Sequence, residues 1–157
     1  MNFYKSLQVL AKTHGNARKD LHNPIKPQPY LVEDQDPMGM LGEMAFALIT
    51  GHAVDLEQRI EGDEGYDFIV PLKFTIDVKT TAKTEKSNNL MVQEGKVKAD
   101  IYVLAMVEND MPDFVGWAWG KQVKAAPTRD FRSGYQSHYI PIDNLSPMDE
   151  LYKRLHR

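Results

Sequence analysis

Several residues and motifs that would define a protein class are missing from this chain of 157 residues. It contains no cysteine, which excludes disulfide bonds and thiolate chemistry and is typical of a reducing compartment. No apolar run approaches the roughly 20 residues that a membrane-spanning helix needs, and segment 1–20 lacks the apolar stretch of a signal peptide. These absences predict a soluble, cytoplasmic, single-domain protein with an ordinary hydrophobic core and no membrane partner.

Two common kinds of catalytic site are also missing. The five histidines show no spacing typical of zinc ligands, and no arrangement of serine and histidine supports nucleophilic catalysis. No glycine-rich loop ending in lysine and serine or threonine is present, which excludes nucleotide hydrolysis through that motif. The chemistry must therefore be sought among the carboxylates and lysines.

The charges are unevenly distributed along the chain. The net charge is −3, but residues 33–77 carry −9, whereas the flanking segments 1–32 and 78–100 carry +4 and +2. Such a pattern fits a metal site beside a phosphate-binding surface, but the charges alone favour an ordinary mixed surface. The acids inside apolar strands decide between these interpretations.

Hydrophobic periodicity predicts how the elements follow one another. Apolar residues recur at helical spacing over 3–18 and 38–51, with a proline-rich loop or extended arm over 20–37 between them. Strands are predicted at 54–60, 66–70 and 74–81 and, after a polar loop at 82–89 and an apolar triplet at 90–92, at 101–107 and 114–120. A short helix at 121–126, an edge strand at 137–142 containing Pro141 and a helix capped by Ser146 complete a mixed α/β sheet flanked by helices.

Acidic side chains interrupt the two strands around Pro71. Because side chains alternate along a strand, Asp77 and Lys79 share one face of segment 74–81. If Val70 pairs with Phe74 in a tight hairpin, Asp67 lies opposite Asp77, with Cβ atoms about 4.5–5.5 Å apart. A slip of one residue would place the two acids on opposite faces. Two carboxylates at such a short distance repel each other and require a compensating charge.

A divalent cation is a natural compensator for these acids. Mg²⁺ prefers carboxylate oxygens and can lower the pKa of a bound water beside a phosphate. Lys79 would orient that water and stabilise the developing charge, and Glu43 would add a carboxylate from helix 38–51. Together these four side chains could form a site for phosphodiester hydrolysis.

The same residues resemble a known superfamily. Tyr66-Asp67, a hairpin-length gap, Asp77-Val78-Lys79 and Glu43 on the preceding helix resemble the PD-(D/E)XK nucleases. The resemblance implies an α/β restriction-endonuclease-like core with a mixed central β-sheet flanked by helices. It also implies Asp67 and Asp77 as ligands of Mg²⁺ or Mn²⁺, Glu43 as the helix carboxylate, Lys79 as the catalytic lysine and DNA products with a 5′-phosphate. Tyr66 stands where the motif has proline, and a crossover helix is hard to place between 82 and 99.

The resemblance also suggests an organisation and a setting. The single domain, 1–157, would comprise an N-terminal helix and proline-rich arm (1–37), a catalytic core (38–107) and C-terminal strands and a helix (108–157). The implied protein is a phage or bacterial endonuclease that binds DNA in the cytoplasm, and a homodimer through the aromatic strand 114–119 is possible. Phosphate contacts are assigned to Lys83, Lys86, Lys96 and Lys98, for which a solvated surface is an equally good interpretation.

Other interpretations remain open at this stage. A nuclease-like fold that no longer cuts would serve as a module that binds nucleic acid or protein, and the acidic isoelectric point favours it slightly. Alternatively, Asp67 and Asp77 could simply be paired with lysines in a small α/β scaffold. Asp63 is expected to be a solvated turn residue, Asp100 a structural cap or ion-pair partner, and Trp117 and Trp119 core residues or a partner surface.

Overall fold

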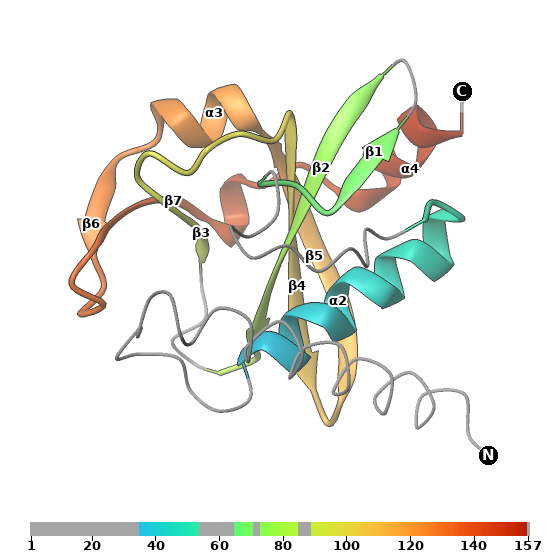
Figure 1. Cartoon of the computed structure of the whole chain (residues 1–157), viewed down its shortest axis with the longest axis horizontal. Coiled ribbons are helices and arrows are strands. Elements are labelled where there is room, and N and C mark those ends of the chain that lie inside the picture. The colour runs from blue at the N-terminus through green and yellow to red at the C-terminus, as the bar shows by residue number, and fades with distance from the viewer. Residues whose placement is uncertain (1–34, 54–64, 71–72, 85–88, 157) are drawn as a thin grey trace, which may run out of the picture.

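A computed structural model describes residues 35–53, 65–70, 73–84 and 89–156, and these form two β-sheets with helices around them (Figure 1). The larger sheet is mixed: β2 and β4 are parallel, and the other neighbouring strands are antiparallel. Its strand order is β1 (Phe68–Val70), β2 (Phe74–Ala82), β4 (Ile101–Glu108) and β5 (Met111–Trp119).

A smaller antiparallel sheet lies beside the larger one. β7 is its middle strand, with β3 on one side and β6 on the other. Its strands are β3 (Asn89–Gln93), β7 (Gln136–Pro141) and β6 (Thr128–Asp130). The helices of the described residues are α2 (Gln35–Thr50), α3 (Gly120–Ala125), the single 3₁₀ turn η1 (Ile142–Asn144) and α4 (Met148–Leu155).

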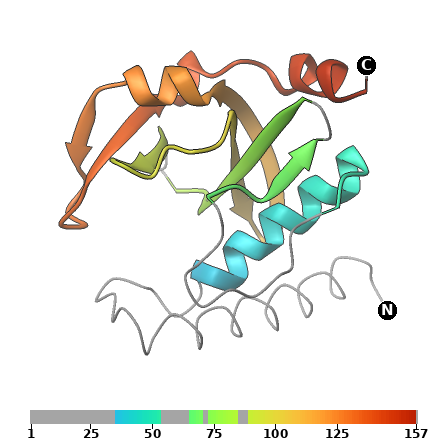
Figure 2. The ribbon, with the colours of Figure 1, turned by 45° about the horizontal axis from the view of Figure 1, so that its top comes forward.

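Both faces of the four-stranded sheet are buried. On one face, α2 and α4 cover a cluster that includes Ile76, Val103 and Trp117, and Figure 2 shows α2 running along this sheet. On the other face, the three-stranded sheet and α3 cover a cluster that includes Tyr102 and Leu104. Because alternate residues of β4 enter opposite clusters, the unbroken apolar run at 101–107 is explained by burial on both sides.

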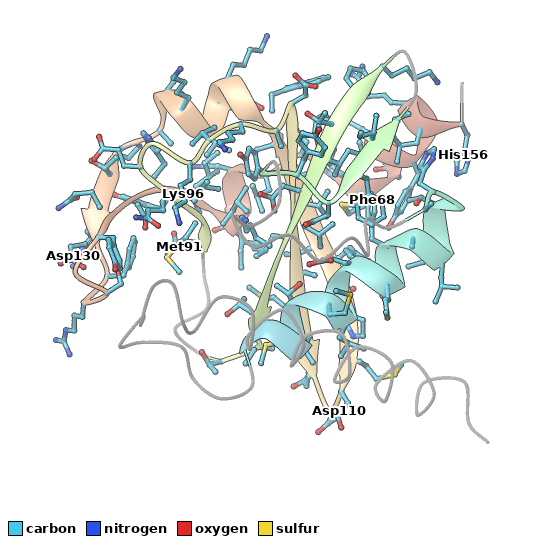
Figure 3. All side chains as sticks on the ribbon, viewed as in Figure 1. Phe68, Met91, Lys96, Asp110, Asp130 and His156 are labelled. Atoms are coloured by element: carbon cyan, nitrogen blue, oxygen red, sulfur yellow. The ribbon has the colours of Figure 1, made fainter. Side chains whose placement is uncertain are left out.

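Aromatic contacts fix α2 against the larger sheet. Phe46 lies on α2 with its ring centroid 5.1 Å from that of Phe68 and 5.6 Å from that of Phe114. Figure 3 shows Phe68 on β1 directed toward α2. Gly42 comes so close to Thr80 on β2 that an added Cβ would overlap the threonine hydroxyl. The turn of α2 that follows Gly42 is therefore held directly against β1 and β2.

The structure confirms most of the predicted elements within the described residues. The helix at 38–51, the strands at 66–70, 74–81, 101–107 and 114–120 and the short helix at 121–126 are all present, with small shifts at their ends. The described helices include none that is long and apolar enough to cross a membrane. The predicted helix at 3–18, the strand at 54–60 and most of the arm at 20–37 lie outside the described residues.

Four local expectations differ from the structure. Segment 137–142 is the middle strand of its sheet, not an edge, because Pro141 is the last residue of β7 and its missing N–H interrupts no interior pairing. The helix at the C-terminal end is capped at Pro147, one residue later than predicted, and α2 begins at Gln35, inside the predicted arm. No helix joins β2 to β4 in described residues 83–84 and 89–100, where the chain forms β3.

Candidate functional site

The hairpin of β1 and β2 has the register on which the predicted site depends. Val70 pairs with Phe74 and Phe68 pairs with Ile76, so Asp67, directly before β1, is set beside Asp77. The backbone N–H of Asp67 donates to the carbonyl oxygen of Ile76 at 2.8 Å, which fixes this residue at the edge of β2. The register prediction is therefore confirmed.

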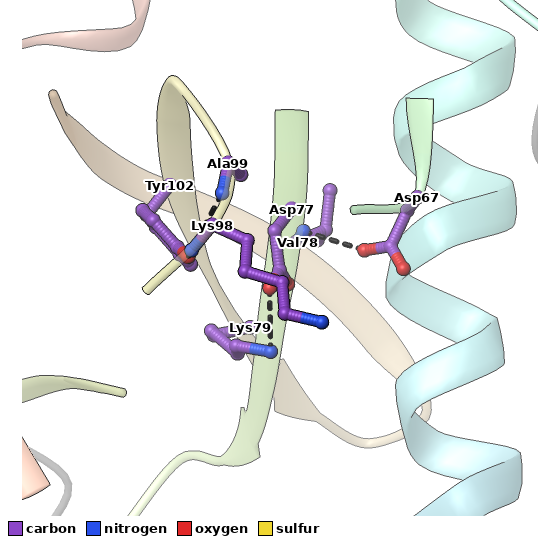
Figure 4. Close-up of polar contacts among 7 residues, drawn as sticks. All are labelled: Asp67, Asp77, Val78, Lys79, Lys98, Ala99 and Tyr102. Carbon is purple, nitrogen blue, oxygen red and sulfur yellow. Dashed lines mark hydrogen bonds and ion pairs between the residues drawn. The ribbon is translucent and has the colours of Figure 1, made fainter. Parts of the chain in front are cut away.

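The Asp67 carboxylate occupies a position normally taken by a neighbouring strand. Its Oδ2 accepts a hydrogen bond from the backbone N–H of Val78 at 2.6 Å (Figure 4). β1 begins only at Phe68, so the side chain supplies an acceptor for the next part of β2. The short, charge-assisted geometry holds the carboxylate rigidly against the strand.

Three acidic side chains of the site are buried. Glu43 from α2, Asp67 from the approach to β1 and Asp77 from β2 are each only 5% exposed. Burial raises the pKa of Asp67 well above its usual range, and the negative charges of Glu43 and then Asp77 raise it further. The positive charge of Lys79 and the hydrogen bond from Val78 act in the opposite direction but are outweighed. Within the described residues, burial and the neighbouring acids therefore outweigh the stabilising partners of the Asp67 carboxylate.

Lys79 is the cationic side chain of this group. Its Nζ lies 2.8 Å from Oδ2 of Asp77, and its side chain is 41% exposed, so it joins the buried acids to the surface. Burial lowers the pKa of Lys79, but Asp77 and then Asp67 outweigh that effect, and the pKa is raised overall. Lys79 is consequently an ammonium at neutral pH, suited to stabilising negative charge and not to accepting a proton.

Tyr102 is a neighbour of the site that the sequence analysis did not single out. Tyr102 pairs with Asp77 across β2 and β4, and its hydroxyl accepts hydrogen bonds from the N–H groups of Lys98 at 2.9 Å and Ala99 at 3.2 Å. Burial raises the pKa of Tyr102, and Asp77 contributes in the same direction. A tyrosine inside an otherwise apolar run was the available signal, since a buried hydroxyl needs a partner.

Lys98 reaches the site because a glycine leaves room for it. Gly65 has a φ of +92°, and an added Cβ would lie 2.7 Å from Cδ of Lys98. The lysine therefore runs along the chain just before Asp67, and Figure 4 shows its amine on the same side of β2 as Asp77. Among the described lysines that were predicted to contact phosphate, Lys98 is thus the one placed beside the carboxylates.

The remaining predicted residues fall in different places. Lys83 is an exposed partner of Glu108 at 2.8 Å, and Lys96 is exposed in the connection from β3 to β4. Asp100 accepts hydrogen bonds from the N–H and hydroxyl of Thr75 at 2.9 and 3.0 Å, which confirms its structural role. Lys86 and Asp63 lie outside the described residues. Trp117 is buried and contacts Trp119 with ring centroids 5.2 Å apart, so this pair belongs to the core.

The carboxylates are the type of ligand that a hard divalent cation prefers, but their side chains do not yet surround a common point. In the described part of the chain, no three His, Cys, Asp or Glu side chains stand close enough together to form a ready-made metal cage. Mg²⁺ does not require one, because it keeps several waters and is commonly held by one or two carboxylates plus substrate phosphates. Asp67 and Asp77 would supply those carboxylates, with Glu43 acting directly or through water.

Comparison with known proteins gives no assignment for this chain. No protein family, no curated protein and no solved structure matches it significantly. The functional interpretation therefore depends on the chemistry of the site itself.

Proposed function

We propose that this protein is a metal-dependent nuclease that hydrolyses phosphodiester bonds of DNA, built on a restriction-endonuclease-like core. The observation that carries the proposal is the gathering of buried Glu43, Asp67 and Asp77 with half-exposed Lys79 on one helix and one hairpin. A purely structural ion pair would need one carboxylate for this lysine. Each additional buried acid adds a desolvation cost, which a bound cation would offset.

Each side chain has a task that its surroundings favour. A bound Mg²⁺ or Mn²⁺ would polarise a phosphate oxygen and lower the pKa of a bound water. The Lys79 ammonium would stabilise the charge that develops on the phosphate. Asp67 and Asp77 would hold the cation through their carboxylates, and Glu43 would assist directly or through water. Attack at phosphorus with departure of the 3′ oxygen would leave a 5′-phosphate.

A second candidate is a nuclease-like fold that binds without cutting. It is favoured by the absence of a ready-made group of three ligands among the described residues and by the net charge of −3. Metal affinity separates the two candidates, because a degenerate site would bind the cation poorly.

The test is a cleavage assay on supercoiled plasmid and labelled single strands in Mg²⁺, in Mn²⁺ and in chelator. We expect metal-dependent cutting by the wild type and a loss on the order of 10²-fold or more in Asp77→Asn and in Lys79→Ala. Lys153→Ala is the matched control, since Lys153 also pairs with a carboxylate, that of Asp149 at 3.0 Å, on the exposed surface of α4.

The possible results lead to different conclusions. Cutting that survives both substitutions would reduce Asp77 and Lys79 to an ion pair of the strand. A folded wild type that binds nucleic acid but never cuts would favour the binding module.

A further inference from the structure

The three-stranded sheet has one face that packs on the core and one that points away from it. Directly paired residues of antiparallel strands point to the same side. Leu90 pairs with Ile140, and both enter the core cluster around Tyr102 and Leu104. The alternate residues therefore form an outward face, and its members are Asn89, Met91, Gln93, Arg129, Ser137, Tyr139 and Pro141.

A row of flat or polarisable side chains crosses this outward face. The guanidinium carbon of Arg129 lies 5.7 Å from the ring centroid of Phe131, which directly follows β6. The Phe131 ring is 5.5 Å from that of Tyr139 on β7, and Tyr139 pairs with Met91 on β3, which is 42% exposed (Figure 3). Guanidinium, two rings and a thioether thus span all three strands.

The charge of this face differs from that of the whole protein. Among the described residues of β3, β6 and β7, no carboxylate points to the outward face, although the chain has 22 acidic residues and a net charge of −3. Asp130 pairs with Gln136 on the opposite side, and its Oδ1 accepts hydrogen bonds from the N–H groups of Ser133 and Gly134 at 2.9 and 3.2 Å. Among these described residues, Arg129 is therefore the charged side chain of the face, with amides and a hydroxyl beside the rings.

We propose that the outward face of β3, β7 and β6 binds single-stranded nucleic acid. Aromatic rings on an open sheet stack with unpaired bases, amides can hydrogen-bond to base edges, and an arginine can contact phosphate. A duplex presents its bases edge-on and could not stack in this way. An acidic protein partner would match the arginine but would leave the row of rings without a specific role.

The connection from β3 to β4 links this face to the candidate nuclease site. It carries exposed Lys96 and then Lys98, whose amine lies on the Asp77 side of β2 (Figure 4). A nucleic-acid strand bound on the outward face would thereby pass Lys96 and Lys98 on its way to the carboxylates. The idea that this face binds the substrate of the nuclease rests on the proposed function. The binding of single-stranded nucleic acid to the face does not depend on it.

The test measures binding of fluorescein-labelled oligo(dT) to the whole protein in chelator by fluorescence anisotropy. Tyr139→Leu removes the ring and should weaken binding about tenfold, whereas Tyr139→Phe keeps the ring and should bind like the wild type. Arg129→Gln should reduce the slope of log affinity against log salt by about 0.7, the value for one phosphate contact on a single strand. Lys124→Gln, at an exposed position of α3, removes the same charge as a control.

Several outcomes would overturn the proposal. Equal binding by Tyr139→Leu and Tyr139→Phe, an unchanged salt slope in Arg129→Gln, or no binding by the folded wild type would each do so. A change in sedimentation mass on Tyr139→Leu with unchanged oligonucleotide binding would identify the face as a contact between copies of the chain. The anisotropy experiment does not depend on cleavage. A protein that binds the oligonucleotide but never cuts DNA would therefore overturn the proposed nuclease activity and leave the binding face in place.

Discussion

At the residue scale, Asp67 is held between opposing influences. The N–H of Val78 favours its ionised form, while burial and the charges of Glu43 and Asp77 favour the protonated form and win. The folded state therefore keeps the proton to a higher pH than the unfolded chain. It follows that Asp67 contributes stability below its ordinary pKa of 3.8, and that this contribution is lost as the pH rises through the raised value.

Asp67→Asn should consequently stabilise the protein at neutral pH while abolishing cleavage. The amide oxygen can still accept the Val78 hydrogen bond, and the buried charge is gone. Each kcal/mol gained would raise Tm by about 2–4 °C in a chain of this size. We expect the advantage to appear in thermal melts in chelator at neutral pH and to shrink as the solution is acidified toward pH about 4.

A surface carboxylate provides the control for this prediction. The hydrogen bond from Lys153 lowers the pKa of exposed Asp149, so its contribution has the opposite sign. Asp149→Asn should therefore give no increase in Tm at neutral pH. An Asp67→Asn variant that melts below the wild type throughout the range would contradict the sign derived for Asp67.

The sequence predicted Asp67, Asp77 and Lys79 as neighbours because one assumption, Val70 opposite Phe74, determines their register. It could not predict the Asp67–Val78 hydrogen bond, which depends on where β1 begins. Lys98 reaches the site through tertiary structure alone, since it lies far along the chain and passes a glycine with positive φ.

At the scale of elements, the distance between α2 and β2 determines where Glu43 lies. Gly42, its neighbour on the helix, meets Thr80, and no larger residue fits without moving the helix or the threonine. Gly39 lies one turn earlier on the same helix, where the nearest atom to an added Cβ is Oε1 of Glu43 at 4.0 Å. An added methyl group would therefore overlap a neighbouring side chain at Gly42 but would have room at Gly39.

Gly42→Ala should destabilise the protein by about 1–3 kcal/mol, because overpacking outweighs the gain in helix propensity. Gly39→Ala should instead be neutral or stabilising by up to about 1 kcal/mol, since the added methyl group meets ordinary van der Waals contact. Urea titration of both variants measures the difference, and a stabilising Gly42→Ala would show that α2 can shift freely from β2.

Elements with a strong pattern were predictable, and pairings between distant segments were not. The unbroken apolar run at 101–107 predicted a strand that is buried on both faces. The triplet at 90–92 gave no sign that it joins β7, and Pro141 suggested an edge because its position at the end of the strand could not be read from the pattern.

At the scale of the whole molecule, metal binding by the buried acids would couple the stability of the fold to cations. A ligand that binds only the folded state stabilises it by about 2.7 kcal/mol at 100 times its dissociation constant. If Asp67 and Asp77 hold Mg²⁺ together, the metal should therefore stabilise the entire fold and not only the site.

We expect the wild-type Tm to rise with MgCl₂ at constant ionic strength, by several degrees near saturation. Asp77→Asn should lose this rise, and Lys153→Ala should keep it, because Lys153 is exposed on α4 and pairs with Asp149. Differential scanning calorimetry measures both, and an equal rise in Asp77→Asn would place the cation elsewhere.

The pairing of β3 with β7 also affects how the protein is made. β3 lies between two strands of the larger sheet in sequence, yet its hydrogen-bonding partner comes from the last part of the chain. At translation rates of about 5–20 residues per second, β3 waits on the order of seconds for that partner. During this interval its backbone edge and the side chains of Leu90 and Val92 have no cover from β7, so the nascent chain is most prone to aggregate just before its final strand leaves the ribosome.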